Sequence, residues 1–254
     1  NIHLLIGLAA CVLFFNINSW GVTETSEARY AEISWEIYQS GDYMHPTLLE
    51  IGHYHKPPVT YWLTALAYHI FGPGVFAARF FLQIAVLVQI LLVYQIGRLL
   101  FENNKTAFYA ASIYFSFPAI VIGTRALTTD HYLTTAVLGA VYCWLKYRSK
   151  NKVPYLYLFY CLIGVGFLIK GPVVLIVPIT VLIAYNYLKP LPGQNNKLHH
   201  LLGVTLCFVI GTSWFIMLYR ENNAFIDYFI FDHTVDRFAT NNFGRKKPFW
   251  FYLV

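Results

Sequence analysis

Ionisable side chains that could carry chemistry are concentrated in one stretch near the start of the chain, residues 24–58. This stretch holds six of the twelve acidic residues of the whole sequence, together with histidines and cations. Further ionisable groups follow at three later places, each next to an apolar run. The candidates are Glu24, Glu27, Arg29, Tyr30, His55 and Lys56 in the first stretch, and Arg125, Asp130, Lys170, His233 and Arg237 beyond it.

This mixture of carboxylates and cations suits group transfer from a phosphate carrier. A carboxylate such as Glu24, Glu27 or Asp130 can act as a general base toward an acceptor hydroxyl. Cations at a membrane surface can hold a phosphate and stabilise it as a leaving group. The residue types therefore predict transfer chemistry on an anionic lipid substrate.

Each candidate also has a purely structural interpretation. Residues 128–130 could cap the following helix. Lys170 could belong to a hairpin between two spans, with its amine reaching toward the membrane surface. Glu32 and Glu36 could form a solvated helix face, and a single histidine such as His233 is more often structural than a ligand.

The composition indicates whether these residues belong to a water-soluble protein or to a membrane protein. The chain is 57% hydrophobic and only 12% charged, with a mean hydropathy of +0.51. Soluble domains carry about 25% charged residues, which excludes a water-soluble globule. The cysteines lie in apolar runs without metal-type spacing and are predicted to be small core residues. They are Cys11, Cys143, Cys161 and Cys207.

The apolar runs predict an all-α polytopic membrane protein with about seven transmembrane helices. The first run, residues 2–20, is too long for most signal-peptide cores and lacks a basic start. Because the chain starts with Asn and stops inside an aromatic run, we expect a piece of a longer protein. The other predicted spans are 75–98, 106–123, 131–147, 155–169, 171–188 and 199–219.

Two helices are predicted to lie along the membrane between the first and second spans. Residues 28–40 have apolar side chains at helical spacing with charges opposite, which is typical of an amphipathic surface helix. Pro57-Pro58 then opens an aromatic helix that Gly72 ends. Tyrosine and tryptophan favour the headgroup level, so this helix too is expected at the interface.

Basic residues divide the connections into two groups. Those after the second, fourth and sixth spans carry basic residues and a single acid, Glu102, whereas the opposite connections hold the other eleven acids. By the positive-inside rule the basic connections are cytoplasmic, and the loops at 21–74 and 220–254 are outside. The net charge of +6 is therefore a topology signal, and no nucleic-acid partner is expected. All the candidate residues fall on the outer side.

The sequence motifs that contain these residues resemble those of a known family. They are similar to the first external loop of the lipid A aminoarabinose transferases and of the wider polyprenyl-phosphate glycosyltransferases, which are akin to protein O-mannosyltransferases. In that loop the similar segments are Ser26–Ile33, Ser40–Asp42, His55–Pro58 and Tyr61-Trp62. The similarity continues in order through Thr129-Asp130, Ile169–Gly171, His233–Phe238 and Pro248–Trp250.

The resemblance implies the GT-C fold, in which residues 1–254 would be part of one membrane domain. Juxtamembrane helices would occupy 21–74, six transmembrane helices 75–219, and a second large external loop the rest. The implied donor is an undecaprenyl-phosphate sugar, and the implied acceptor is a cell-envelope lipid or protein. Transfer would invert the anomeric centre on the periplasmic face of the bacterial inner membrane.

The resemblance also implies roles for individual residues. Lys56 and Arg237 would engage the lipid phosphate, Asp130 would match a functional aspartate, and Lys170 would line the cavity. Arg125 is included among the substrate-binding residues only because it is predicted to lie on the outer side. The expected substrate-binding residues are therefore Arg29, Tyr30, Lys56, Arg125, Lys170 and Arg237.

The sequence departs from the family pattern at two places. The lipid A enzyme binds metal with a carboxylate before the Lys-Pro and a histidine after span seven; these positions are His55 and His233 here, a pair that suits zinc. Where the family has an aspartate, this chain has Ser26. Three explanations are open: the acid has moved to Glu24, Glu27 takes the role of the missing aspartate, or the activity of this protein is altered. We expect Glu27 to take the catalytic role, with Glu24 in support.

Two other classes of function remain. A transporter or flippase of lipid-linked sugars would place ionisable groups near the midplane of broken helices, often in repeated halves. Here those groups cluster at one face and no repeat is evident, which favours the enzyme. A non-catalytic binder would hold the carrier sugar without consuming it.

Overall fold

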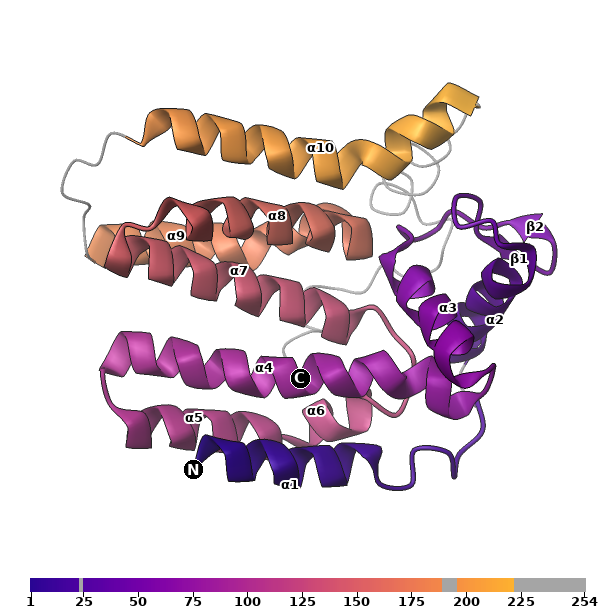
Figure 1. The fold of residues 1–254 in the computed structure, drawn as a ribbon, viewed down its shortest axis with the longest axis horizontal. Coiled ribbons are helices and arrows are strands. Elements are labelled where there is room, and N and C mark those ends of the chain that lie inside the picture. Colours follow the sequence, from indigo (N-terminus) through magenta and orange to yellow (C-terminus); the bar gives the residue numbers. More distant parts are fainter. Residues whose placement is uncertain (23–24, 189–195, 222–254) are drawn as a thin grey trace, which may run out of the picture. The chain divides into compact units, whose positions relative to one another are not determined.

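The computed structural model of the protein describes residues 1–22, 25–188 and 196–221 (Figure 1). The chain divides into two compact units, residues 1–212 and 213–254. The described residues are almost entirely helical, as predicted. Their elements are α1 (Ile2–Phe14), α2 (Thr25–Ser40), β1 (Thr47–Leu48), β2 (Ile51–Gly52), α3 (Val59–Phe71), α4 (Val75–Phe101), α5 (Asn104–Ser116), α6 (Pro118–Gly123), α7 (Asp130–Lys150), α8 (Val153–Lys170), the 3₁₀ helix η1 (Gly171–Leu175), α9 (Ile176–Leu188) and α10 (Lys197–Glu221).

Helix α4 is central to the first unit, with α1 and α5 on one side and α7 on the other (Figure 1). On the first side, buried Leu13 of α1 packs in one core cluster with Val86 and Ile90 of α4. On the other side, Trp144 of α7 packs against Phe159 of α8 in a second cluster. The helices therefore form layers, and each layer buries apolar side chains against α4 or α7.

Three described stretches are long and apolar enough to cross a membrane: Val75–Phe101, Val153–Leu188 and Lys197–Glu221. The second of these is not one straight helix. Gly171 has φ 74°, a left-handed conformation that suits glycine, and the chain reverses there through η1 into α9 (Figure 1). The predicted separation into spans 155–169 and 171–188 is thus confirmed, whereas the count of seven spans stays a prediction.

Two predicted spans differ from the structure. Helix α1 ends at Phe14, so residues 15–22 form a loop instead of the end of a span. The helix predicted over 106–123 is divided into α5 and α6 at Phe117, which has φ −66° and ψ 121°. The cause is Pro118, which lacks an N–H and disfavours helical backbone in the residue before it.

The segment between α1 and α4 contains the two predicted interfacial helices, α2 and α3. Their apolar faces pack on each other through Ile33 and Ile37 of α2 and Tyr61 and Ala65 of α3. This packing confirms the amphipathic pattern from which α2 was predicted.

A hairpin that the sequence did not predict lies between these helices, with Thr47 paired to Gly52. Glu36 accepts hydrogen bonds from the Thr47 hydroxyl and from the backbone N–H groups of Leu49 and Glu50. Leu49 and Glu50 both have positive φ, so this carboxylate stabilises a strained turn. Glu36 therefore stabilises the hairpin turn through hydrogen bonds and is not simply part of a solvated helix face.

The connections lie at two ends of the helical layers (Figure 1). The turns between α4 and α5 and between α7 and α8 lie at one end. The turns between α3 and α4, α6 and α7, and α8 and α9 lie at the other, beside α2 and the hairpin. This division agrees with the one that the charges of the connections predicted.

Candidate active site

Asp130 and Lys170 form an ion pair at the end of the layers where α2 and α3 lie. Asp130 is the first residue of α7 and Lys170 is the last residue of α8. Because these helices are antiparallel neighbours, the two residues meet, and Lys170 Nζ donates to Asp130 Oδ1. The Asp130 side chain is 62% exposed and that of Lys170 is 29% exposed. Two candidates from the ends of separate helices thus form one polar site that is open to solvent.

The capping interpretation of residues 128–130 is confirmed only in part. Thr129 occupies the N-cap position of α7, but its side chain makes no capping hydrogen bond. That side chain instead hydrogen-bonds Tyr30 of α2. Asp130 lies in the first turn, where a negative charge is favoured by the helix dipole. Thr129 therefore joins α2 to the start of α7.

Tyr30 lies beside this ion pair. Its burial raises the pKa of the phenol above the ordinary value, and Asp130 adds to the rise, while the bond to Thr129 and the charge of Arg29 lower it. The phenol therefore stays protonated at neutral pH. The Tyr30 ring packs 5.5 Å from the ring of Tyr61, which fixes α2 against α3. Arg29, the next residue along α2, is exposed.

Glu27 has a different environment from the one expected of a catalytic carboxylate. Its side chain is 1% exposed and forms a bidentate pair with Arg79, with Nε to Oε1 at 2.7 Å and Nη2 to Oε2 at 2.9 Å. The backbone N–H of Leu127 donates to the same Oε1 at 3.1 Å. The carboxylate is thus held inside the protein, and its predicted role as the base stays a prediction.

Arg79 is the main residue that the sequence interpretation missed. Besides Glu27, its guanidinium donates from Nη1 to the carbonyls of Ile17 and Trp20 at 3.2 and 3.0 Å, and from Nη2 to that of Gly21 at 3.2 Å. All five N–H groups of an arginine are then occupied. Arg79 therefore fastens the loop after α1 to α4 and to α2, and has no donor left for a substrate.

Two glutamines on α4 position the segment that leads to Asp130. Gln83 Nε2 donates to the carbonyl of Thr124 at 3.0 Å, and Gln89 Nε2 donates to that of His131 at 2.7 Å. Gln89 also accepts a 2.6 Å hydrogen bond from the hydroxyl of Tyr114. Both ends of the α6–α7 connection are thereby tied to the central helix.

Arg125 does not join the Asp130–Lys170 pair. It donates from Nη1 to the carbonyl of Phe15 at 3.0 Å and from Nη2 to that of Val12 at 3.2 Å, at the C-terminal end of α1. Helices α1 and α7 lie on opposite sides of α4 (Figure 1). The expected single cluster of cations is therefore divided between two places.

The remaining candidates lie before α3 or outside the described residues. His55 and Lys56 are half-buried between β2 and α3, and the rings of His53 and His55 have centroids 4.0 Å apart. Within the described ranges, no group of three or more histidine, cysteine or acidic side chains could hold a metal ion. Zinc therefore stays a prediction. The candidates outside the described residues are Glu24, His233 and Arg237.

Comparison with known proteins places this chain in a family. Residues 55–217 match the family described as dolichyl-phosphate-mannose-protein mannosyltransferase. The chain is 30% identical to the undecaprenyl phosphate-alpha-4-amino-4-deoxy-L-arabinose arabinosyl transferase of Yersinia pestis (strain Pestoides F), over 97% of this chain and 46% of that protein. A second such transferase, from Proteus mirabilis (strain HI4320), is 28% identical over 94% of this chain and 44% of its own length.

The fold agrees with the crystal structure of ArnT from Cupriavidus metallidurans bound to undecaprenyl phosphate. The TM-score is 0.85 at 25% identity, over 99% of this chain and 47% of that one. The chain therefore belongs to the dolichyl-phosphate-mannose-protein mannosyltransferase family and has the GT-C fold of a multi-pass membrane protein. It spans a little less than half the length of the relatives that it matches.

Proposed function

We propose that the protein is a membrane glycosyltransferase. It moves a sugar from an undecaprenyl-phosphate carrier to an oxygen of a cell-envelope lipid or protein, at the periplasmic face of the bacterial inner membrane. The activity of the Yersinia and Proteus relatives, which are undecaprenyl phosphate-dependent arabinosyl transferases, supports the donor class. The observation that carries the proposal is the solvent-open Asp130–Lys170 pair at the end of the layers where the acidic connections gather.

In the proposed reaction the acceptor oxygen attacks the anomeric carbon on the face opposite the carrier phosphate. The bond from that carbon to the phosphate oxygen breaks, and its electron pair leaves with the carrier. Where the acceptor is a hydroxyl, its proton passes to the Asp130 carboxylate, because this is an exposed acid paired with a cation. Lys170, with Lys56 and Arg29, would stabilise the phosphate as it leaves.

Glu27 takes a positioning role in this proposal. Its carboxylate joins Arg79 to the Leu127 N–H, and Leu127 lies three residues before Asp130. A change at Glu27 would therefore reach the reaction through the placement of Asp130. Glu24, which lies outside the described residues, remains a candidate for direct participation.

A zinc ion held by His55 and His233 is kept as part of the proposal, but no step depends on it. The described residues offer two neighbouring imidazoles, His53 and His55, whereas zinc sites use three or four protein ligands. A complete site would need ligands from outside the described residues. Metal analysis of the purified protein, with His55→Ala as the comparison, tests this directly: zinc retained in the variant would exclude His55.

Reconstitution tests the main proposal. The full-length protein in proteoliposomes would receive a panel of radiolabelled undecaprenyl-phosphate sugars together with envelope lipids and proteins. We expect label to move to an acceptor in the wild type, and transfer to fall at least about 100-fold in Asp130→Asn and Lys170→Met. Glu102→Gln and Lys150→Met, at the opposite end of the layers, are matched controls and should retain transfer.

Two outcomes would contradict the proposal. Label that crosses the bilayer while still attached to its carrier would identify a transporter. Full turnover in both Asp130→Asn and Lys170→Met would show that the ion pair takes no part in the chemistry.

A further inference from the structure

Cations from three elements gather at the end of the layers opposite the candidate active site (Figure 1). One lies in the last turn of α4, two lie near the end of α7, and another directly precedes α8. The charges of Lys150, Arg98 and Lys152 all act on the amine of Lys146, so these side chains lie close together. We call this group the basic patch; its members are Arg98, Lys146, Lys150 and Lys152.

The basic patch receives no counter-charge from the described part of the chain. Its cations form neither an ion pair nor a side-chain hydrogen bond with any described residue. The connections at this end contain a single acid, Glu102. It caps the end of α4 and is exposed, and it does not pair with Arg98 one turn earlier. Like charges that are held together repel one another, and an anion bound among them removes that repulsion.

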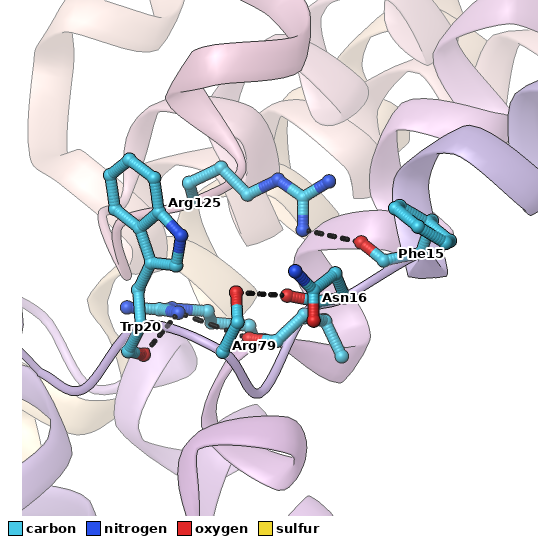
Figure 2. Close-up of a pocket in the computed structure, with 7 residues that line it drawn as sticks. Phe15, Asn16, Trp20, Arg79 and Arg125 are labelled. Atoms are coloured by element: carbon cyan, nitrogen blue, oxygen red, sulfur yellow. Dashed lines mark hydrogen bonds between the residues drawn. The ribbon is translucent and has the colours of Figure 1, made fainter.

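Two arginines near the candidate active site have a different environment. Arg79 donates to the carbonyl of Trp20 and pairs with a buried carboxylate, and Arg125 donates to the carbonyl of Phe15 (Figure 2). The protein itself therefore supplies their partners, whereas the basic patch offers its charge to a ligand. The positive-inside rule accounts for the number of cations at that end but does not require three elements to bring them together.

Tyrosine rings surround the basic patch. Lys146 Nζ lies 5.7 Å from the centroid of the Tyr142 ring, and Arg98 Cζ lies 5.9 Å from that of Tyr94. Tyr142 is also within electrostatic range of Arg98 and of Tyr155 on α8. Tyrosine favours the headgroup level of a membrane, and lysine and arginine extend their apolar stems so that the cation reaches that level. The patch therefore lies where lipid headgroups lie.

Exposed leucines continue this surface toward the membrane interior. Leu91 lies two turns before Arg98 on the same face of α4 and is 39% exposed. Leu158 lies one turn after Tyr155 on α8 and is 46% exposed. Acyl chains attached to a headgroup in the patch would lie beside these side chains. A soluble phosphate has the same charge but gains nothing from the apolar surface.

We propose that the basic patch binds an anionic phospholipid whose headgroup carries two phosphates, of the diphosphatidylglycerol class. The patch has more positive charge than one phosphodiester can balance, so a headgroup with two is favoured. Basic pockets between transmembrane helices on the cytoplasmic side suit such lipids, and the charges of the connections predict that this end is cytoplasmic. Binding here is separate from sugar transfer, because the candidate active site lies at the opposite end of the layers.

Native mass spectrometry of the full-length protein in detergent micelles tests the proposal, because it counts bound lipids without requiring activity. The protein would be titrated with diphosphatidylglycerol, with phosphatidylglycerol, which has one phosphate, and with the zwitterionic phosphatidylethanolamine. We expect diphosphatidylglycerol to bind at least about tenfold more tightly than phosphatidylglycerol, and phosphatidylethanolamine to bind least. Inorganic pyrophosphate should not displace the lipid at equal concentration.

Paired substitutions separate the patch from the general charge of this end. Arg98→Gln combined with Lys146→Gln should weaken diphosphatidylglycerol binding at least about tenfold. The matched control is Lys105→Gln combined with Lys197→Gln, which removes two exposed cations from the same end but from α5 and α10. This control should change the affinity less than about twofold.

Three results would overturn the proposal. Equal losses of affinity in the two paired variants would show a general attraction to the basic end and no defined site. Equal binding of phosphatidylglycerol would exclude the two-phosphate class, and equally effective displacement by pyrophosphate would exclude a lipid. Should the paired patch variant fail to fold, Lys152→Gln changes only an exposed turn residue; unaltered affinity in that variant would equally overturn the proposal.

Discussion

Two carboxylate–cation pairs lie at the same end of this membrane domain and differ in their exposure to solvent. The side chains of Glu27 and Arg79 are 1% and 2% exposed, and every N–H of the arginine is occupied. Those of Asp130 and Lys170 are 62% and 29% exposed. Removing one partner of a buried pair costs about 3–5 kcal/mol, whereas an exposed pair contributes about 0–1 kcal/mol.

The comparison shows that residue type alone does not separate a structural carboxylate from a reactive one. Glu27 is surrounded by donors that the protein itself supplies, so it holds four segments together. The Asp130–Lys170 pair contributes little to folding and can therefore exchange its partners for those of a substrate.

The largest effect is expected at Arg79. Arg79→Met leaves the Glu27 carboxylate buried without its cation and removes the donor to three carbonyls. We expect the free energy of unfolding to fall by about 3–5 kcal/mol, measured by chemical unfolding in detergent. Arg98→Met, at an exposed arginine near the other end of α4, should change it by less than about 1 kcal/mol. Equal losses in the two variants would remove the distinction between the pairs.

The next effect is on catalysis and not on stability. Asp130→Asn should lower kcat by about 10²–10⁴ if Asp130 is the general base, with less than about 1 kcal/mol lost in unfolding. Glu27→Gln should lower kcat less than Asp130→Asn does while destabilising the fold more, because Glu27 is buried and acts through position. A larger loss of kcat in Glu27→Gln than in Asp130→Asn, at unchanged stability, would make Glu27 the base.

The smallest effect concerns a third pair, Asp42 and His45, with side chains 47% and 35% exposed. Slight burial raises the pKa of Asp42, but hydrogen bonds from the His45 ring and from the N–H groups of Met44 and His45 outweigh it, so the pKa is lowered. The pair therefore stabilises its turn above the ordinary aspartate pKa of about 3.9, and this contribution is lost as pH falls through the lowered value.

Hydrogen exchange checks this third prediction. After correction for intrinsic rates, the amides of Met44 and His45 should lose protection as the pH falls below about 4. Asp42→Asn should abolish that pH dependence while leaving exchange in α7 unchanged. Protection that does not depend on pH in the wild type would show that the turn does not need the carboxylate.

The sequence predicted those elements whose cause is local. The interfacial helices followed from the spacing of apolar residues in α2 and from Pro57-Pro58 before α3, and the two ends of the layers followed from the charges of the connections. The hairpin was missed because strands of two residues have no measurable period. Its turn depends on Glu36, which reaches the Leu49 N–H from 13 residues away.

The site was predicted as a set of residues but not as an arrangement. Asp130 and Lys170 were both assigned to the outer side, yet their contact depends on the packing of α7 against α8 over 40 residues of sequence. The burial of Glu27 depends on Arg79, 52 residues away. A signal for Arg79 was present, since a cation inside an apolar run needs a partner.

The break at Phe117-Pro118 gives the span of α5 and α6 a hinge. Bending of a helix concentrates where a proline interrupts its hydrogen-bond ladder, so α6 can pivot on α5. Its six residues carry no buried side chain, whereas Thr124 at its end is held to α4 by Gln83 and the start of α7 is held there by Gln89. Movement at the break would therefore stay within α6 and leave the Asp130 end of the connection in place.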